Sequence, residues 1–438
     1  MKLDEDKTET REYIRITELE TSNNKLVVKL DFSENVSKFF LTDKFVAEYD
    51  RNIEDVDESI LVIPPLSIVI PIAWATGADV YVEKLDKSYL DSLNKVEQVF
   101  RGWFPRFSFS GKIHVQNVIS NKFNNKGYAL LFSGGVDSLT SYVRHKDKQP
   151  TLISIWGADI PLHEYKFWNR VRSRLLNFAD EEGVDIQFIK ANIQEIPKDS
   201  LLTSEYGVES WWGSVSHGII FLGLCAPLTT EKIGTIFSAS PGARINDATN
   251  VLVDSGISWA DVKIIHDGSE LSRQEKIKIL KSNPCCLSYL RVCWSQHLEY
   301  NCGYCEKCLR TIVGLILENI DPEVCNFKIK NNTLNLMRIY LTKGILNLTD
   351  NEICMWQDIQ KYIPETIVDS EVSRKYKSEK FFRWFKNFDF SSYKYNGSKL
   401  SHFSKLYYLL KYTGIRNTSK RVCKMCFYFI PSFNARSD

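Results

Sequence analysis

Short apolar runs alternate with longer amphipathic segments across the middle of this chain, and this alternation constrains the fold more than any other feature. Runs rich in β-branched and aromatic residues predict strands, and apolar residues at helical spacing predict the helices between them. The predicted strands are 128–132, 151–155, 185–190 and 233–238, and the predicted helices follow Gly135 and span 165–182 and about 212–228. Strands that alternate with helices form a parallel sheet with right-handed crossovers, so we expect an α/β, Rossmann-like domain that binds ligands at the carboxyl ends of its strands.

The segments on either side of this alternation predict two further parts. Residues 13–117 mix strands such as 25–31 with helices, and Asp86 is placed to cap a helix whose apolar face is Tyr89, Leu93, Val96 and Phe100. The polar, turn-rich segment 121–127 indicates a boundary, and from about residue 330 the pattern becomes helical. We therefore predict an N-terminal α/β module (1–120), a nucleotide-binding parallel-sheet domain (121–325) and a helical, basic C-terminal region (326–438).

Charge is unevenly distributed along the 438 residues. The 56 Lys and Arg nearly balance the 54 Asp and Glu, so the net charge of +2 excludes a strong overall field for nucleic acid or membrane. Residues 372–438, in contrast, contain 15 Lys or Arg against 3 Asp or Glu, and are rich in aromatic residues. Such a tail is either a docking surface for nucleic acid, anionic lipid or an acidic partner, or a helical cap with aromatic residues in its core. We favour the cap, so nucleic-acid contact is open but not preferred.

The compartment follows from cysteine content and from the N-terminus. Eleven cysteines, an odd number, follow an N-terminal segment without an apolar signal sequence, which predicts a reducing cytoplasm. Residues 59–78 and 211–230 have no Asp, Glu, Lys or Arg. Both contain proline, so we expect buried elements rather than membrane spans.

A glycine-bearing segment follows the first strand of the alternation. Residues 131–140 read LFSGGVDSLT, in which two glycines allow close approach of the backbone, and the next helix presents its N-terminus. This context predicts a phosphate-binding loop, although it is neither a Walker loop nor G-x-G-x-x-G. Asp137 suits such a loop if Mg²⁺ lies between carboxylate and phosphate. The candidate binding residues are Ser133, Gly134, Gly135, Val136, Asp137 and Ser138.

Four cysteines follow in the pattern C-x8-C-x2-C-x2-C. Cys293, Cys302, Cys305 and Cys308 have the spacing of thiolates that fold onto one tetrahedral ion, and Gly303 allows the tight turn between two of them. Zinc is the first choice, and an iron–sulfur centre is the alternative. No activating base accompanies the cysteines, so we expect a structural ion that joins the loop after the sheet to a helix at 309–318.

The segment Ser-Gly-Gly-Val-Asp-Ser resembles the PP-loop of the ATP pyrophosphatases. This resemblance implies a HUP/PP-loop fold, cleavage of ATP to AMP and pyrophosphate, and adenylation of an acyl oxygen, with residues 133–138 holding the pyrophosphate end of ATP. The four-cysteine pattern is similar to the zinc site of QueC-like 7-cyano-7-deazaguanine synthases, and residues 271–276 (LSRQEK) look like a Leu-Thr-Lys-x-Glu segment of that family. The resemblance covers about residues 125–320. It departs from the family at 156–159 (WGAD), where the small synthase has Tyr-Gly-Gln-x-His.

Long QueC-like proteins of anti-phage gene clusters of the Qat and CBASS kinds are more similar to this chain. They imply that an activated 7-deazaguanine carboxylate is passed to a partner protein of the same cluster instead of ammonia. In such a reaction Asp137 would be catalytic, and Arg244, in the loop after the fourth strand, would pair with a carboxylate. For that loop an ordinary surface salt bridge is the alternative, and His217 is more simply a core histidine than a base.

Two other functions stay open from the sequence. One is a PP-loop enzyme like the epimerases of the cell-wall precursor glutamate, in which adenylation of a carboxylate serves racemisation. The other is a non-catalytic subunit that binds ATP and assembles a complex.

Overall fold

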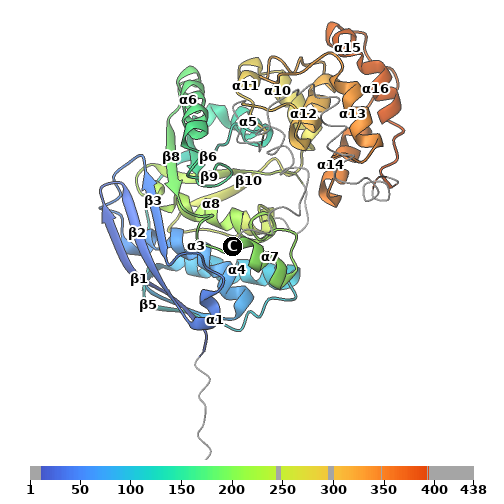
Figure 1. Cartoon of the computed structure of the whole chain (residues 1–438). Coiled ribbons are helices and arrows are strands. Elements are labelled where there is room, and N and C mark those ends of the chain that lie inside the picture. Colours follow the sequence, from blue (N-terminus) through green and yellow to red (C-terminus); the bar gives the residue numbers. More distant parts are fainter. Residues whose placement is uncertain (1–10, 243–247, 294–299, 347, 392, 394–438) are drawn as a thin grey trace, which may run out of the picture. The chain divides into compact units, whose positions relative to one another are not determined.

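The computed structural model of the chain describes residues 11–242, 248–293, 300–346, 348–391 and 393 (Figure 1). The chain divides into two compact units, Met1–Ser272 and Arg273–Asp438, which are described separately below. The division into three parts at residues 120 and 325 stays a prediction.

The first unit is built on one ten-stranded sheet in the order β10-β9-β6-β7-β8-β3-β2-β1-β4-β5. The strands are β1 (Tyr13–Ser22), β2 (Lys25–Phe32), β3 (Lys44–Tyr49), β4 (Asp79–Asp86), β5 (Ile113–Ile119), β6 (Gly127–Leu131), β7 (Thr151–Trp156), β8 (Ile186–Ala191), β9 (Ile233–Ala239) and β10 (Lys263–Asp267).

The half of the sheet from β10 to β8 is entirely parallel. In chain order its strands lie 5-4-1-2-3, with β6 as the first, so the direction of winding reverses between β6 and β9. This is the Rossmann-like arrangement, and ligands bind at the carboxyl ends of the two strands that flank such a reversal. The predicted α/β class and parallel sheet are confirmed.

The N-terminal strands continue the same sheet. β3 pairs antiparallel with β8, with Ala47 opposite Ala191, and β2 pairs antiparallel with both β3 and β1. Beyond them, β1, β4 and β5 are parallel. The turn-rich segment 121–127 thus separates β5 and β6, the edge strand and the central strand of one sheet.

Helices cover both faces of the parallel half. Helices α5 (Val136–His145) and α6 (Tyr165–Glu182) contact β6, β8 and β9 on one face, and α8 (His217–Cys225) lies on the other against α3 (Ile63–Thr76) (Figure 1). Side chains along each strand alternate between these two faces. Those that face the core of α3 and α8 include Ala129, Ile153, Ile189 and Ile236. On the opposite face Phe132 stacks on Phe178 of α6, with ring centroids 5.0 Å apart.

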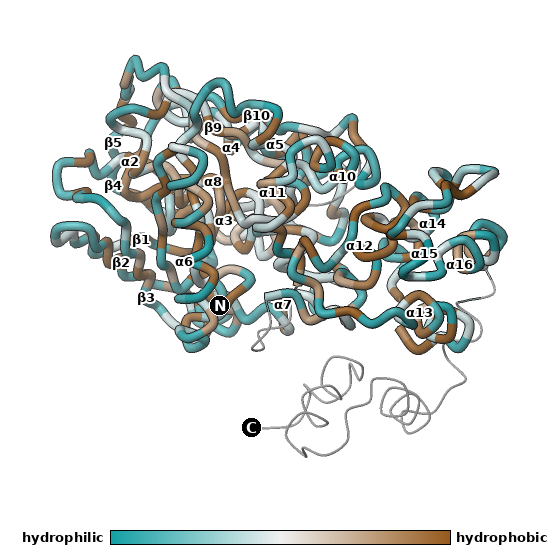
Figure 2. The backbone as a smooth tube through the Cα atoms, turned by 90° about the horizontal axis from the view of Figure 1, so that it is seen from above, coloured by the Kyte–Doolittle hydropathy of each residue, from teal (hydrophilic) through white to brown (hydrophobic). Residues whose placement is uncertain are grey.

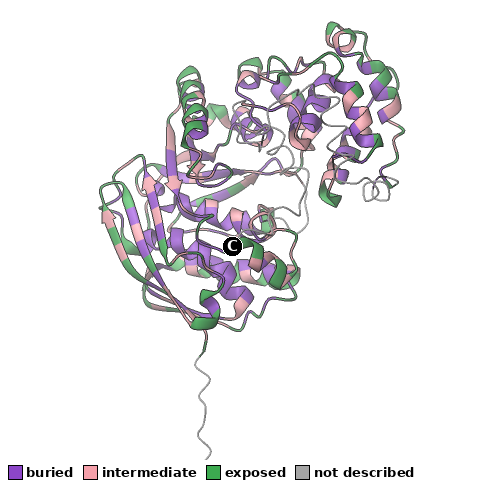
Figure 3. Cartoon of the chain, in the orientation of Figure 1, coloured by how far each residue is buried: buried purple, intermediate pink, exposed green. Residues whose placement is uncertain are grey.

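The two apolar stretches of the sequence form the centre of this core. The residues of α3 and α8 are mostly hydrophobic (Figure 2), and both helices are buried (Figure 3). Within the described residues one helical stretch, Trp211–Thr229, is long and apolar enough to cross a membrane by length and composition. Of its apolar window, 72% is buried inside the protein, as in a core helix. Burial of both stretches agrees with the sequence prediction.

The remaining helices of the first unit are short except for α4, whose N-terminus is formed as the sequence predicts. The Asp86 carboxylate accepts a hydrogen bond from the backbone N–H of Tyr89, and Leu93, Val96 and Phe100 are fully buried with Tyr89. The helices are α1 (Glu34–Ser37), α2 (Glu58–Leu61), α4 (Lys87–Trp103), α7 (Asp199–Tyr206) and α9 (Val251–Asp254), with short turns η1 (Lys146–Lys148), η2 (Trp211–Ser216) and η3 (Ala226–Thr229).

The second unit is helical in its described part. Its helices are α10 (Arg273–Lys281), α11 (Pro284–Ser288), α12 (Glu306–Leu317), α13 (Thr333–Thr342), α14 (Asp350–Lys361), α15 (Glu371–Tyr376) and α16 (Ser378–Phe385). Phe381, Phe382 and Phe385 of α16 are buried, and Phe385 meets Trp356 of α14 edge to face at 5.7 Å. The first aromatic residues of the basic region therefore form core. Cys423, Cys426 and the rest of the basic tail lie outside the described residues.

Candidate functional sites

The glycine-bearing loop lies between β6 and the N-terminus of α5. Gly134 has φ +72°, a left-handed conformation that favours glycine, and Gly135 is the N-cap residue of α5. Gly135 offers no side-chain cap to this helix. At the start of any α-helix the first N–H groups lie beyond the ladder of i to i−4 hydrogen bonds, so they are the donors that a bound anion can use. The structure thus forms the strand, turn and helix N-terminus that binding of an anion requires.

The two serines of the loop lie close to its backbone. Ser138 is buried, and its hydroxyl donates to the Gly135 carbonyl at 3.3 Å. The backbone N–H of Ser133 points at the same Ser138 oxygen at 3.4 Å, whereas Ser133 itself is exposed. Asp137 is half-buried in the first turn of α5. The six residues 133–138 therefore present backbone donors, two hydroxyls and one carboxylate within one turn of chain.

The place of this loop in the sheet is the reversal between β6 and β9. The chain leaves β9 at Ser240, whose backbone N–H donates to the Asp267 carbonyl at the end of β10 (2.8 Å). Gly242 follows with φ +118° and open space where a Cβ would lie. The next residues, among them Arg244, lie outside the described residues, so the role predicted for Arg244 stays a prediction.

One charged cluster at the C-terminal end of α5 was not foreseen from the sequence. Asp267 is buried, and one of its carboxylate oxygens lies 3.0 Å from His145 Nε2 and 3.3 Å from an Arg144 guanidinium nitrogen. Arg144 also pairs with Glu270 at 2.5 Å. A hydrogen bond from its own backbone and the one from Arg144 lower the pKa of Glu270. The cluster fixes the end of α5 to the end of β10.

A second buried group on the other face of the sheet was also missed. Asp254 Oδ2 accepts hydrogen bonds from the Ser238 hydroxyl (2.6 Å) and, at 2.9 Å, from Nδ1 of His266. All three side chains are almost completely buried. They belong to β9, α9 and β10, and no local pattern joins them, because the partners are 12 and 16 residues apart.

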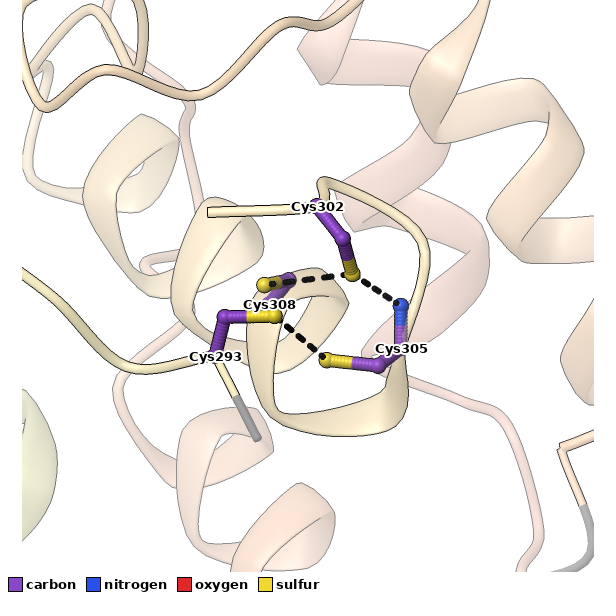
Figure 4. A group of neighbouring side chains, drawn as sticks. All are labelled: Cys293, Cys302, Cys305 and Cys308. Atoms are coloured by element: carbon purple, nitrogen blue, oxygen red, sulfur yellow. Dashed lines mark hydrogen bonds between the residues drawn. The ribbon is translucent and has the colours of Figure 1, made fainter. Parts of the chain in front are cut away.

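The four predicted cysteines meet in the second unit (Figure 4). Their four sulfur atoms all lie within 4.8 Å of one another. The Sγ atoms of Cys293 and Cys305 are 3.9 Å apart, and those of Cys302 and Cys308 are 3.8 Å apart. Four thiolates at about 2.3 Å from one zinc ion would be separated by about 3.8 Å. The cluster is therefore preshaped to hold a metal ion such as zinc.

The local chain explains why the sulfurs converge. Gly303 has φ +74°, and the turn that it allows directs the backbone N–H groups of Tyr304 and Cys305 at the Cys302 sulfur, at 3.5 and 3.2 Å. Cys305 is then the N-cap of α12, and Cys308 lies in its first turn. The predicted helix at 309–318 begins three residues earlier than expected, at Glu306.

Cys293 reaches the cluster from a separate segment, which one buried amide holds in place. The Asn301 side-chain oxygen accepts from the backbone N–H of Val292 (2.9 Å), and its nitrogen donates to the carbonyls of Leu290 (2.7 Å) and Cys325 (3.1 Å). Asn301 is fully buried. Its amide thus ties together the three segments around the sulfurs.

The electrostatics of the cluster favour a cation. Burial raises the pKa of the Cys302 and Cys308 thiols, whereas hydrogen bonds from the other three thiols lower the pKa of Cys293. Several thiolates in so small a volume repel one another, and a divalent ion removes this repulsion.

Comparison with protein-family models, with curated proteins and with solved structures finds no match to this chain.

Proposed function

We propose that this protein is a QueC-like adenylating enzyme of the PP-loop kind, which cleaves ATP to AMP and pyrophosphate and activates a carboxylate. One observation carries the proposal: the segment Ser-Gly-Gly-Val-Asp-Ser joins β6 to α5 at the point where the winding of the parallel sheet reverses. That is the place where Rossmann-like sheets bind nucleotides, and the motif there resembles a PP-loop.

In this proposal the loop binds the leaving diphosphate of ATP. The N–H groups of the first turn of α5 and the hydroxyls of Ser133 and Ser138 donate to phosphate oxygens, which are the acceptors that such donors stabilise best. Asp137 suits a Mg²⁺ ion that neutralises the phosphates. A carboxylate oxygen attacks the α-phosphorus, and the bond from that phosphorus to the oxygen that bridges it to the β-phosphorus breaks. The bridging oxygen leaves with the pyrophosphate, which the loop holds as its charge develops.

The activated acid is a 7-deazaguanine carboxylate, by resemblance to the long QueC-like proteins, and its acceptor is a partner protein. The four cysteines, with a zinc ion, hold the second unit together without taking part in the chemistry.

The test is release of pyrophosphate from ATP in the presence of 7-carboxy-7-deazaguanine. Asp137→Ala should abolish release, whereas Asp147→Ala, at an exposed aspartate after the same helix, should leave it unchanged. ATP binding without any release by the wild type would indicate a nucleotide-sensing subunit instead. Equal release by Asp137→Ala and the wild type would refute the assignment of the loop.

A further inference from the structure

His217, Thr249 and the carbonyl of Trp212 form a chain of hydrogen bonds in the first unit. The Nδ1 atom of His217 lies 3.0 Å from the Trp212 carbonyl oxygen, and Nε2 is hydrogen-bonded to the Thr249 hydroxyl. A carbonyl only accepts, so in the neutral imidazole Nδ1 carries the proton. Nε2 is then the acceptor, and the Thr249 hydroxyl donates to it.

The backbone around His217 fixes the orientation of its ring. Trp211–Ser216 is a π-helical turn, and the Trp212 carbonyl accepts the backbone N–H of His217 as well as its ring N–H. One carbonyl therefore holds both the main chain and the imidazole of the same residue. Such π-helical turns are rare, and they occur frequently at functional sites.

Close contact of two segments brings Thr249 to the imidazole. A Cβ on Gly218 would lie 2.0 Å from the Ala248 carbonyl oxygen and 3.3 Å from Asp254 Oδ1, so only glycine permits this approach. Asp254 in turn accepts from Ser238 near the carboxyl end of β9. The pair thus lies at the carboxyl end of the strand next to β6, on the face of α8, and the loop 133–138 leads into α5 on the other face (Figure 1).

We propose that Thr249 is a nucleophile that accepts an acyl group, with His217 as its general base. A hydroxyl bonded to an imidazole whose other nitrogen is oriented by a third group is the arrangement that activates serine and threonine nucleophiles. Here the Trp212 carbonyl is the third group, and it orients the imidazole by accepting the hydrogen bond from Nδ1. Both residues are half-buried.

The step balances without any further reactant. The Thr249 oxygen attacks the acyl carbon, His217 Nε2 takes the hydroxyl proton, and the bond from the acyl carbon to the leaving oxygen breaks with its electron pair on that oxygen. The products are an ester on Thr249 and the leaving group, which receives the proton from His217. That the natural donor is an acyl adenylate, with AMP leaving, rests on the proposed function.

The experiment uses p-nitrophenyl acetate as the donor, so that it does not depend on adenylation. The full-length protein should release nitrophenolate in a burst and gain one acetyl group, which peptide mass spectrometry should place on Thr249. Thr249→Val removes the attacking oxygen and should abolish the burst and the adduct. His217→Ala should lower the burst rate about a hundredfold, and imidazole in solution should partly restore it. Thr230→Val, which removes a hydroxyl bonded to backbone, serves as the control.

Thr249→Ser keeps a hydroxyl and should keep the adduct, which separates loss of the nucleophile from loss of folding. An adduct that persists in folded Thr249→Val, or no adduct on the folded wild type, would overturn the proposal. Failure of the proposed function looks different: the acetyl adduct would form on Thr249 while no pyrophosphate is released from ATP.

Discussion

Removal of one sulfur ligand is the most direct perturbation of the second unit. The vertices of a tetrahedron lie at about 0.61 of its edge from the centre, so sulfur separations of 3.8 and 3.9 Å correspond to metal–sulfur distances of about 2.3 and 2.4 Å. These are the distances of a single zinc ion. An iron–sulfur centre spreads four cysteines over two or four irons, which sets sulfurs on different irons farther apart. We therefore expect one zinc per chain and no visible absorption.

The size of the effect follows from the energetics of structural zinc sites. Binding contributes about 10 to 16 kcal/mol in zinc-finger peptides. If the four thiolates share this equally, each accounts for about 3 kcal/mol, so Cys308→Ser should weaken zinc binding about a hundredfold. Cys354→Ser removes an exposed cysteine outside the cluster and should leave the zinc content at one per chain.

The assay is metal analysis of purified variants, followed by competition with a coloured chelator. Chelation should also remove an unfolding transition, because the metal free energy is as large as the stability of a typical domain. Full zinc content in Cys308→Ser at chelator concentrations that distinguish a hundredfold change would refute the assignment of this ligand. Iron in the wild-type protein would refute zinc.

Two further predictions concern stability. Gly183 has φ +66° and nothing near the position of a Cβ, so Gly183→Ala should lower the free energy of unfolding by about 1 kcal/mol. Gly157 has φ +105°, and its Cβ would lie 1.8 Å from the Ala191 carbonyl oxygen, so Gly157→Ala should cost about 1 to 3 kcal/mol more. Equal costs of the two variants in denaturant titrations would contradict the contact. Burial raises the pKa of Asp321, but hydrogen bonds from Lys375 and Tyr376 outweigh this effect and lower the pKa below the ordinary 3.8 of an aspartate. The ionised carboxylate therefore stabilises the fold fully above pH 3.8, and this stabilisation is lost as the pH falls through the lowered pKa of the folded state. Asp321→Asn should therefore have a lower melting temperature than the wild type at pH 7, and the difference should shrink as the pH falls through the folded pKa of Asp321. A difference that stays constant with pH would refute the charge effect.

The sequence alone was sufficient to predict elements whose ends are fixed by nearby residues. Helix α6 spans the predicted residues 165–182 because Gly183 adopts the left-handed conformation that ends it. The cap at Asp86 and the meeting of four cysteines were predictable for the same reason, because each depends on residues close together in the chain. In these places spacing alone specifies the geometry.

The features that escaped prediction depend on contacts between distant residues. β3 reaches β8 through pairs such as Ala47 with Ala191, and nothing in either strand specifies that partner. The buried bonds from Ser238 and His266 to Asp254 likewise join three elements whose sequences show no common pattern. The pattern of a strand predicts that the segment is extended, but it does not specify which strand pairs with it. The sequence of 13–117 was therefore compatible with a separate sheet as well as with an extension of the central one.

The same distinction explains why some of the candidate sites could be predicted from the sequence and one could not. The cysteine cluster and the loop 133–138 are local motifs, whereas the pair His217 and Thr249 forms only when α8 packs against the segment before α9. An isolated histidine in an apolar helix is ordinarily a core residue. Its hydroxyl partner lies 32 residues away, and the orienting carbonyl depends on a π-helical turn that residue type does not predict. Tertiary packing therefore assembles the proposed acyl acceptor, whereas local sequence specifies the proposed nucleotide loop.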